Sequence, residues 1–194
     1  MTLKFWARSF VVAALFGAAM PVFAAEITSP AKQAHVTDFA TGKILFSKDA
    51  DAPMKPASMA KIMTVFVAFQ RIADGQLGMD DKFTISEKAW KKGGSRTFLE
   101  VGRTVSVREL LYGIIVQSGN DAAIVLAEGI SGTENAFVQE MNFWAKKIGM
   151  KNTNFRNSTG WPDPELTTTA ADLSIMTTEL IRRFPADEYP DLYP

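Results

Sequence analysis

Cysteine is absent from this sequence of 194 residues, and histidine occurs once, as His35. Without cysteine the chain has no disulfides and no thiolate chemistry. One histidine cannot supply the usual ligands of a zinc site, and a Ser-His-Asp triad would have to use His35, which nothing in the sequence places near a serine. We interpret His35 as a structural residue in a strand. Lysine is then the natural base for any serine nucleophile in this chain.

An excess of charge of one sign is also missing, because 21 acidic residues balance 21 lysines and arginines. A chain without a basic surplus is not typical of proteins that bind nucleic acid or anionic membrane surfaces. Beyond the N-terminus, no apolar stretch reaches the length of about twenty residues that crosses a bilayer. We therefore expect no nucleic-acid partner.

The first 24 residues have the pattern of a secretory signal peptide. Lys4 and Arg8 precede an apolar stretch from Phe10 to Met20, and the small residues that follow predict cleavage after Ala24. The apolar stretch of about eleven residues is short for a membrane span, and an uncleaved anchor is the alternative. We expect export to the periplasm or cell envelope. The remaining residues, 25–194, are enough for one domain with its own core.

The hydrophobic periodicity and the turn residues predict both strands and helices. A hairpin is expected near the start of the mature chain, and a short strand follows later. The stretch 152–165 is expected to be irregular, and the tail 184–194 to form no complete element. The strands are predicted at 35–39, 44–47 and 83–85, and the helices at 58–73, 106–116, 121–129, 133–148 and 168–183.

Ser58-Met59-Ala60-Lys61 is the first motif with chemical content. In a helix, positions i and i+3 lie on one face, so the hydroxyl of Ser58 and the amine of Lys61 can meet. A serine hydroxyl needs a base to become a nucleophile, and a lysine is such a base only if burial or nearby cations lower its pKa. The predicted helix is apolar nearly all round, which places it inside a domain and would desolvate Lys61.

The Ser-x-x-Lys pattern alone is weak, because chance gives about one match in a chain of this length. Ser29-Pro30-Ala31-Lys32 also matches, but Pro30 and its polar neighbours favour an extended linker. For Ser58 the alternative interpretation is a helix N-cap serine with a solvated lysine one turn later.

Ser118-Gly119-Asn120 is the second motif, and it lies between two apolar helices. The functional interpretation is a hydroxyl that relays a proton and an amide that holds a substrate backbone. The alternative is a helix C-terminus at Gly119 followed by a polar N-cap. Two such motifs about sixty residues apart, each beside a buried helix, are far rarer by chance than either motif alone.

With these motifs in place, the chain resembles the serine-type D-Ala-D-Ala carboxypeptidases, the low-molecular-weight penicillin-binding proteins. The resemblance runs from Ala34 to Arg183 and includes the segments 56–64, 108–123 and 150–157. It implies a β-lactamase/transpeptidase-like fold of the α/β (α+β) class, in which an antiparallel sheet has helices on both sides. It also implies that residues 25–194 belong to a catalytic domain that needs no metal and no organic cofactor.

The resemblance implies roles for four residues. Ser58 would attack the carbonyl of the penultimate D-alanine in a peptidoglycan stem peptide and form an acyl-enzyme, and Lys61 would take its proton. Ser118 would relay a proton to the leaving D-alanine, and Asn120 would hold the peptide. Water would then hydrolyse the ester. β-Lactams would mimic the substrate and acylate Ser58.

The family's third motif, Lys-Thr-Gly, is missing from the 194 residues. Ser158-Thr159-Gly160 is the nearest string, but it has no cation and lies in the wrong region. The strand with the third motif would bind the terminal carboxylate of the substrate and give one N–H to the oxyanion hole, whose loss costs about 10²–10³ in rate. We therefore expect a partial catalytic domain without the family's membrane anchor, poorly folded in isolation.

Two other functions stay open at this point. One is a truncated, non-catalytic remnant that binds peptidoglycan or a partner. The other is a β-lactamase-like hydrolase, which would need a carboxylate to activate the deacylating water. Glu165 lies in a plausible region for that carboxylate but lacks the surrounding signature.

Overall fold

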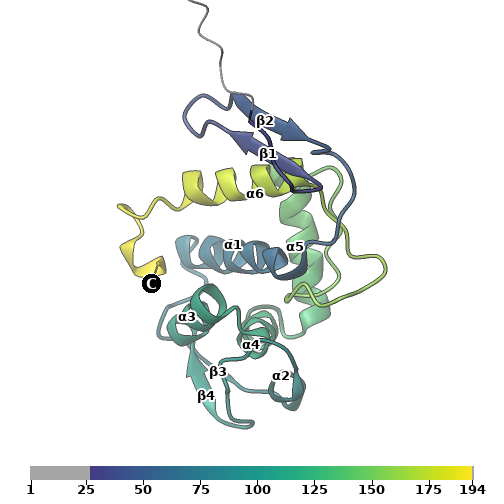
Figure 1. The fold of residues 1–194 in the computed structure, drawn as a ribbon. Coiled ribbons are helices and arrows are strands. Elements are labelled where there is room, and N and C mark those ends of the chain that lie inside the picture. Colours follow the sequence, from purple (N-terminus) through teal and green to yellow (C-terminus); the bar gives the residue numbers. More distant parts are fainter. Residues whose placement is uncertain (1–26, 194) are drawn as a thin grey trace, which may run out of the picture.

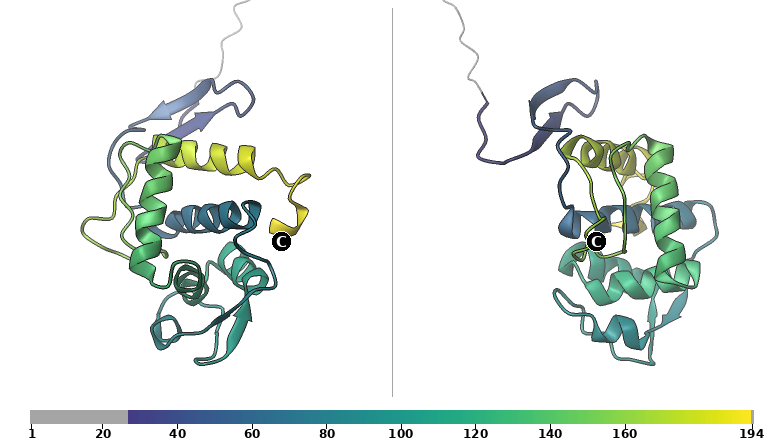
Figure 2. Two further views of the ribbon diagram at one scale, coloured as in Figure 1. Left: turned by 180° about the vertical axis from the view of Figure 1, so that it is seen from behind. Right: turned by 90° about the vertical axis from the view of Figure 1, so that its right-hand side faces the viewer.

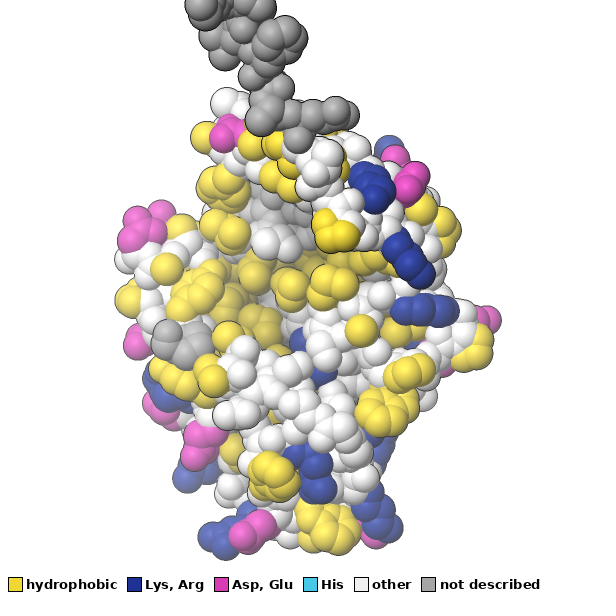
Figure 3. Space-filling view, viewed as in Figure 1, with side chains coloured by type: hydrophobic (Ala, Val, Ile, Leu, Met, Phe, Trp, Pro, Cys, Tyr) yellow, Lys and Arg dark blue, Asp and Glu magenta, His cyan; other side chains and the backbone are white. Residues whose placement is uncertain are grey.

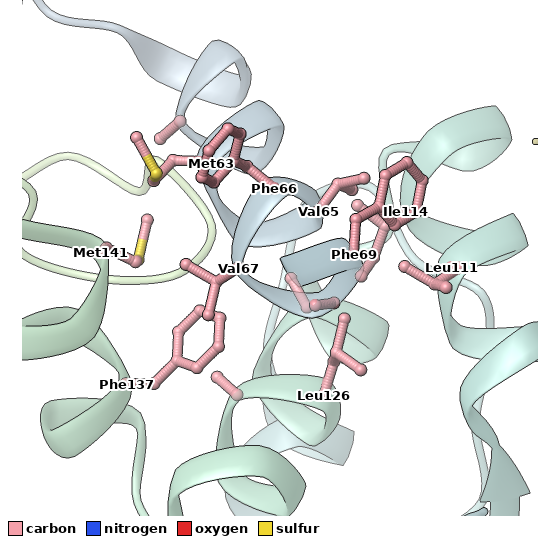
Figure 4. Packing of buried hydrophobic residues seen from close by; sticks show 14 of the residues in the cluster. Met63, Val65, Phe66, Val67, Phe69, Leu111, Ile114, Leu126, Phe137 and Met141 are labelled. Carbon is pink, nitrogen blue, oxygen red and sulfur yellow. The ribbon is translucent and has the colours of Figure 1, made fainter. Parts of the chain in front are cut away.

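A single apolar helix, α1 (Ala60–Ala73), runs through the middle of the molecule (Figure 1). The computed structural model describes residues 27–193, so the predicted signal peptide lies outside the described residues. Most of α1 is buried, including Met63, Phe66 and Phe69. Figure 4 shows these side chains meeting others from the surrounding helices. The prediction that this helix is central and apolar nearly all round is confirmed.

Four helices pack against α1, namely α3 (Val107–Gln117), α4 (Asn120–Ser131), α5 (Glu134–Ile148) and α6 (Ala170–Arg183). Figures 1 and 2 show α6 on one side of α1, α3 and α4 on the other side, and α5 crossing near its N-terminal end. All four were predicted within about two residues at each end, which is the usual uncertainty of helix boundaries. Three of their N-termini are fixed by side-chain caps, from Ser106 on α3, Thr133 on α5 and Thr169 on α6.

The strands form two separate antiparallel pairs at opposite ends of the molecule (Figure 1). The predicted hairpin is present as β1 (Ala34–Thr37) and β2 (Ile44–Lys48), and it packs against α6. The second pair is β3 (Lys82–Thr84) with β4 (Thr104–Ser106). The α+β class is confirmed, but residues 27–193 distribute their strands over two small sheets instead of one sheet with helices on both sides.

Two short elements have no counterpart in the sequence prediction: β4 and the five-residue helix α2 (Glu87–Lys91). Such short segments show no readable hydrophobic period, and their geometry depends on neighbours far along the chain. The tail differs from expectation as well. It contains a short 3₁₀ helix, Pro190–Leu192, and its Phe184 and Leu192 are buried. The Phe184 ring lies edge-on to Phe66 and to Phe69, each at 5.7 Å, so the tail is part of the core.

Within residues 27–193, no helix combines the length and the apolar character needed to span a bilayer. The same residues contain no group of three or more His, Cys, Asp or Glu side chains placed to hold a metal ion. In the space-filling view of Figure 3, hydrophobic side chains gather in a hollow in the middle of the face, over α1 and between α6 and α3. The residues that line the site described next come from the same helices, α1, α3 and α6.

Candidate active site

Ser58 and Lys61 meet at the N-terminal end of α1. The chain reaches this point through a short 3₁₀ turn, Ala57–Met59, so Ser58 lies just before the α-helix and is exposed to solvent. Lys61 is in the first turn of α1, and its side chain is 4% exposed. Its ammonium nitrogen Nζ lies 3.3 Å from Ser58 Oγ, within hydrogen-bonding distance. The local spacing of the motif therefore brings the hydroxyl and the amine together.

Burial changes the acidity of the Lys61 ammonium. Nζ also donates a hydrogen bond to the backbone carbonyl of Thr159 at 2.9 Å. A neutral amine still has N–H groups, so it can make the contacts with Ser58 and Thr159 as well as the charged form can. Desolvation lowers the pKa of Lys61 to about 8. A lysine with this pKa has a substantial neutral fraction near neutral pH, which a general base requires. The arrangement can therefore remove a proton from Ser58.

The loop at 158–160 is bound closely to α1. The Thr64 hydroxyl on α1 donates a hydrogen bond to the backbone carbonyl of Ser158 at 2.7 Å. Gly160 has a φ of +77°, and a Cβ added there would lie 1.7 Å from the Ala57 carbonyl oxygen. Glycine is therefore required, because the turn needs the left-handed region and the close approach leaves no room for a side chain. The string Ser158-Thr159-Gly160, which lies too early in the sequence to be the family's third motif, is nevertheless at the site.

Glu134 fixes this loop from the opposite side. Its carboxylate accepts hydrogen bonds from the backbone N–H of Ser158 at 3.0 Å and from its hydroxyl at 2.8 Å, and it forms an ion pair with Lys88 at 2.6 Å. Burial alone would raise the pKa of Glu134, but the hydrogen bonds from Lys88 and Ser158 outweigh it and leave that pKa lowered. The carboxylate thus stays charged and holds the loop in place.

Ser118 and Asn120 lie where α3 ends and α4 begins. Ser118 is the C-cap of α3 in the left-handed conformation, with a φ of 53°, and Gly119 is extended. A left-handed conformation at a non-glycine residue is strained and is held by surrounding structure. Asn120 is the first residue of α4 and is 6% exposed, and its Nδ2 donates to the Gly93 carbonyl at 2.8 Å. The helix C-cap considered as an alternative is present, but at Ser118 and not at Gly119.

A cavity of about 290 Å³ joins the two motifs. Ser58, Lys61 and Ser118 all line it, so three of the four proposed residues share one space. Asn120 does not line it, although it lies two residues beyond Ser118. The rest of the wall comes from α1, α3, α6 and the tail, with the residues Ile62, Val65, Phe69, Ile114, Ile115, Leu180 and Tyr193. Apolar walls of this kind keep water from solvating a charged lysine.

Two features of the site escaped the sequence analysis. Asp121 is fully buried, and its carboxylate accepts from the N–H and the hydroxyl of Thr97 and from the N–H of Leu99, which holds the loop that Asn120 also contacts. The Thr159 carbonyl is the second partner of Lys61. A buried acid directly after the second motif was a readable signal. The Thr159 carbonyl could not be found in this way, because a backbone carbonyl has no signature in the sequence.

Two other candidates lie elsewhere. The Glu165 side chain is 68% exposed and pairs with Arg156 at 3.2 Å, and it does not line the cavity of Ser58. His35 lies in β1, faces a separate cavity between the hairpin and α6, and has a buried Nδ1 without a hydrogen-bond partner among the described residues. Neither side chain is placed to activate a water molecule or a serine at this site.

Known proteins with similar sequences agree with the resemblance that the two motifs indicate. The family described as D-alanyl-D-alanine carboxypeptidase matches residues 20–190, and the chain belongs to this family. A D-alanyl-D-alanine carboxypeptidase of Bacillus subtilis, DacF, is 43% identical over 157 residues, which are 81% of this chain and 40% of the relative. The chain thus spans less than half the length of this curated relative.

Solved structures show the same fold. The D-alanyl-D-alanine carboxypeptidase DacD from Francisella tularensis aligns with a TM-score of 0.80 and 43% identity, over 82% of this chain and 38% of that one. Penicillin-binding protein 5 from Haemophilus influenzae aligns with a TM-score of 0.79 and 37% identity, over 82% and 48%. The β-lactamase/transpeptidase-like fold expected from the sequence is thereby confirmed at the level of the family.

Proposed function

We propose that this member of the D-alanyl-D-alanine carboxypeptidase family is a serine-type hydrolase that removes the terminal D-alanine from peptidoglycan stem peptides. The observation that carries the proposal is the contact between the exposed hydroxyl of Ser58 and the buried amine of Lys61, at 3.3 Å. A nucleophile in hydrogen-bond reach of a base with a lowered pKa is the arrangement that acyl transfer through a serine requires.

In the acylation step, Ser58 Oγ attacks the carbonyl carbon of the penultimate D-alanine while Lys61 Nζ takes the hydroxyl proton. The new C–O bond forms an ester, and the C–N bond to the terminal D-alanine breaks. The departing amine needs a proton, which Lys61 supplies through the hydroxyl of Ser118 on the same cavity wall. Asn120 holds the peptide backbone of the substrate. In the second step, water cleaves the ester and its proton returns to Ser58 Oγ.

β-Lactams would enter the same cavity and acylate Ser58, because they present a strained amide to the same nucleophile. Penicillin-binding protein 5 from Haemophilus influenzae, whose structure aligns with this chain, is named for penicillin binding, which supports this assignment. The substrate belongs to the bacterial cell wall, so the proposed place of action is the periplasm or cell envelope. The proposed reaction uses no metal and no organic cofactor.

The proposal is tested by the intact mass of the full chain after incubation with benzylpenicillin, beside Ser58→Ala and Ser29→Ala variants. The missing third motif favours weak labelling, but the contact between Ser58 and Lys61 leads us to expect one penicilloyl adduct in the unmodified chain and in Ser29→Ala, and none in Ser58→Ala. Circular dichroism shows whether each variant is folded. Absence of the adduct from a folded, unmodified chain would refute the proposal and favour a non-catalytic remnant that binds peptidoglycan.

A second measurement separates the carboxypeptidase from the β-lactamase-like alternative. A carboxypeptidase keeps the penicilloyl ester for a long time, whereas a β-lactamase hydrolyses it quickly and releases penicilloic acid. Because Glu165 pairs with Arg156 outside the cavity, we expect a stable adduct and slow release. Rapid turnover of benzylpenicillin would contradict this expectation.

A further inference from the structure

Trp161 is held firmly by its backbone but leaves its ring partly exposed. Its N–H donates to Asn157 Oδ1 at 2.9 Å and to Thr159 Oγ1 at 3.1 Å, and its carbonyl accepts from Asn157 Nδ2 at 2.9 Å. The side chain is nevertheless 42% exposed. A large aromatic residue fixed in this way costs little conformational entropy when a ligand binds to it, which is typical of recognition surfaces.

Lys92 covers the ring of Trp161, with Nζ 4.0 Å from the ring centroid. Among the ion pairs of the described residues, Lys88 pairs with Glu134 and Lys91 with Glu87, but Lys92 has no carboxylate within salt-bridge distance. Burial lowers the pKa of Lys92, with the charge of Lys88 adding to this effect and that of Glu134 opposing it. A partly desolvated ammonium on an aromatic face is therefore available for an anion.

The Lys92–Trp161 pair lies directly beside the site. Gly93, the residue after Lys92, gives its carbonyl to Asn120 Nδ2 at 2.8 Å. Gly160, the residue before Trp161, packs against the carbonyl of Ala57, which precedes Ser58. The Trp161 ring also lies against Gly94, where a Cβ would be 3.1 Å from the ring and 2.8 Å from Asn120 Nδ2. The pair thus connects the two loops that support the two motifs.

We propose that Lys92 and Trp161 form a subsite for a side-chain carboxylate on the substrate residue that precedes the two D-alanines. The inference rests on the proposed function, since it concerns the part of the peptide that Asn120 holds. The indole face packs against the aliphatic part of that side chain, and the ammonium of Lys92 pairs with its carboxylate. The subsite makes the enzyme selective for stem peptides with an acidic side chain at this position.

Two matched peptides test this subsite: acetylated Glu-D-Ala-D-Ala and acetylated Gln-D-Ala-D-Ala. They have nearly the same shape and differ in one charge. Dissociation constants are measured by calorimetry with the full chain carrying Ser58→Ala, so that turnover plays no part. We expect the Glu peptide to bind about fivefold more tightly, as is typical for a partly exposed ion pair.

Variants then locate the preference. Lys92→Met should abolish the discrimination between the two peptides, whereas Lys91→Met, which removes a neighbouring lysine already paired with Glu87, should retain it. Trp161→Ala should weaken the binding of both peptides. Trp161→Phe should retain most of the affinity, because an aromatic face remains. Equal affinity for both peptides in the parent, or binding of neither, overturns the proposal. So does an equal loss of discrimination in Lys91→Met.

This outcome is separable from that of the proposed function. The penicillin adduct reports on Ser58 in the unmodified chain, and the peptide pair reports on selectivity without chemistry. A normal adduct with equal peptide affinities would refute the subsite alone. A missing adduct with clear discrimination would refute the hydrolase alone.

Discussion

The chain contains the same four-residue pattern twice, and the two copies have very different surroundings. In Ser29–Lys32, the lysine is exposed, and the contacts of Ser29 are made to Ala31 N–H at 3.2 Å and to Lys48 Nζ at 3.1 Å. In Ser58–Lys61, the lysine is 4% exposed and its Nζ contacts the serine hydroxyl. The comparison shows that the spacing of the motif alone does not make the lysine a base, because the lysine side chain must also be buried away from solvent.

Replacing each lysine tests the comparison most severely. Lys61→Met keeps the length of the side chain but removes the amine, so we expect the rate of Ser58 acylation by benzylpenicillin to fall about 10³-fold, within the range for general-base catalysis. Lys32→Met should leave the rate unchanged. Time-resolved intact mass measures both rates. An acylation rate in Lys61→Met that equals the parent rate would show that another group acts as the base.

The pH dependence of acylation tests whether burial sets the basicity of Lys61. The neutral amine is the active form, and it becomes populated as pH rises through the lowered pKa of about 8. The acylation rate should therefore increase about tenfold for each pH unit below 8 and level off above it. Adduct formation measured from pH 6 to 10 gives the profile. A rate that still rises tenfold per pH unit between pH 8 and 10 would mean that Lys61 titrates like an exposed lysine.

Gly160→Ala tests how closely the 158–160 loop must approach the motif. The substitution adds a Cβ 1.7 Å from the Ala57 carbonyl oxygen at a residue with a φ of +77°. We expect a loss of about 3 kcal/mol in the free energy of unfolding, together with slower acylation.

Gly149→Ala is the matched control for Gly160→Ala. Gly149 also has a positive φ, of +96°, but a Cβ there meets nothing within 4 Å. It should lose about 1 kcal/mol, which is the cost of the backbone conformation alone. Denaturant unfolding measures both variants. Equal losses would contradict the close approach at Gly160.

Thr64→Val is expected to have the smallest effect. It keeps the shape of the side chain but removes the hydrogen bond from Thr64 Oγ1 to the Ser158 carbonyl at 2.7 Å. The expected loss is about 1 kcal/mol in the free energy of unfolding, because one buried carbonyl loses its partner. Acylation should persist, since Glu134 still holds the loop through Ser158. A stability equal to that of the parent would show that this hydrogen bond contributes nothing.

The helices were predictable where their hydrophobic period is long. The prediction of 133–148 agrees with α5 to one residue, and the prediction of 168–183 agrees with α6 to two. By contrast, α2 and β4 have five and three residues, too few to show a period, and went unpredicted. The left-handed Ser118 was also unpredictable, because only the surrounding loops enforce that conformation.

The sequence by itself determined the central apolar helix, the family motifs and the meeting of Ser58 with Lys61, because residues three apart on one helix are neighbours whatever else the chain does. The apolar helix after Ser58 also indicated that Lys61, and not Lys32, is the buried lysine. The tertiary structure decided which segments bury it. Lys61 receives its second contact from Thr159, 98 residues further along, and its cavity wall from α3, α6 and the tail. Desolvation depends on which distant segments exclude water, and no local spacing encodes it.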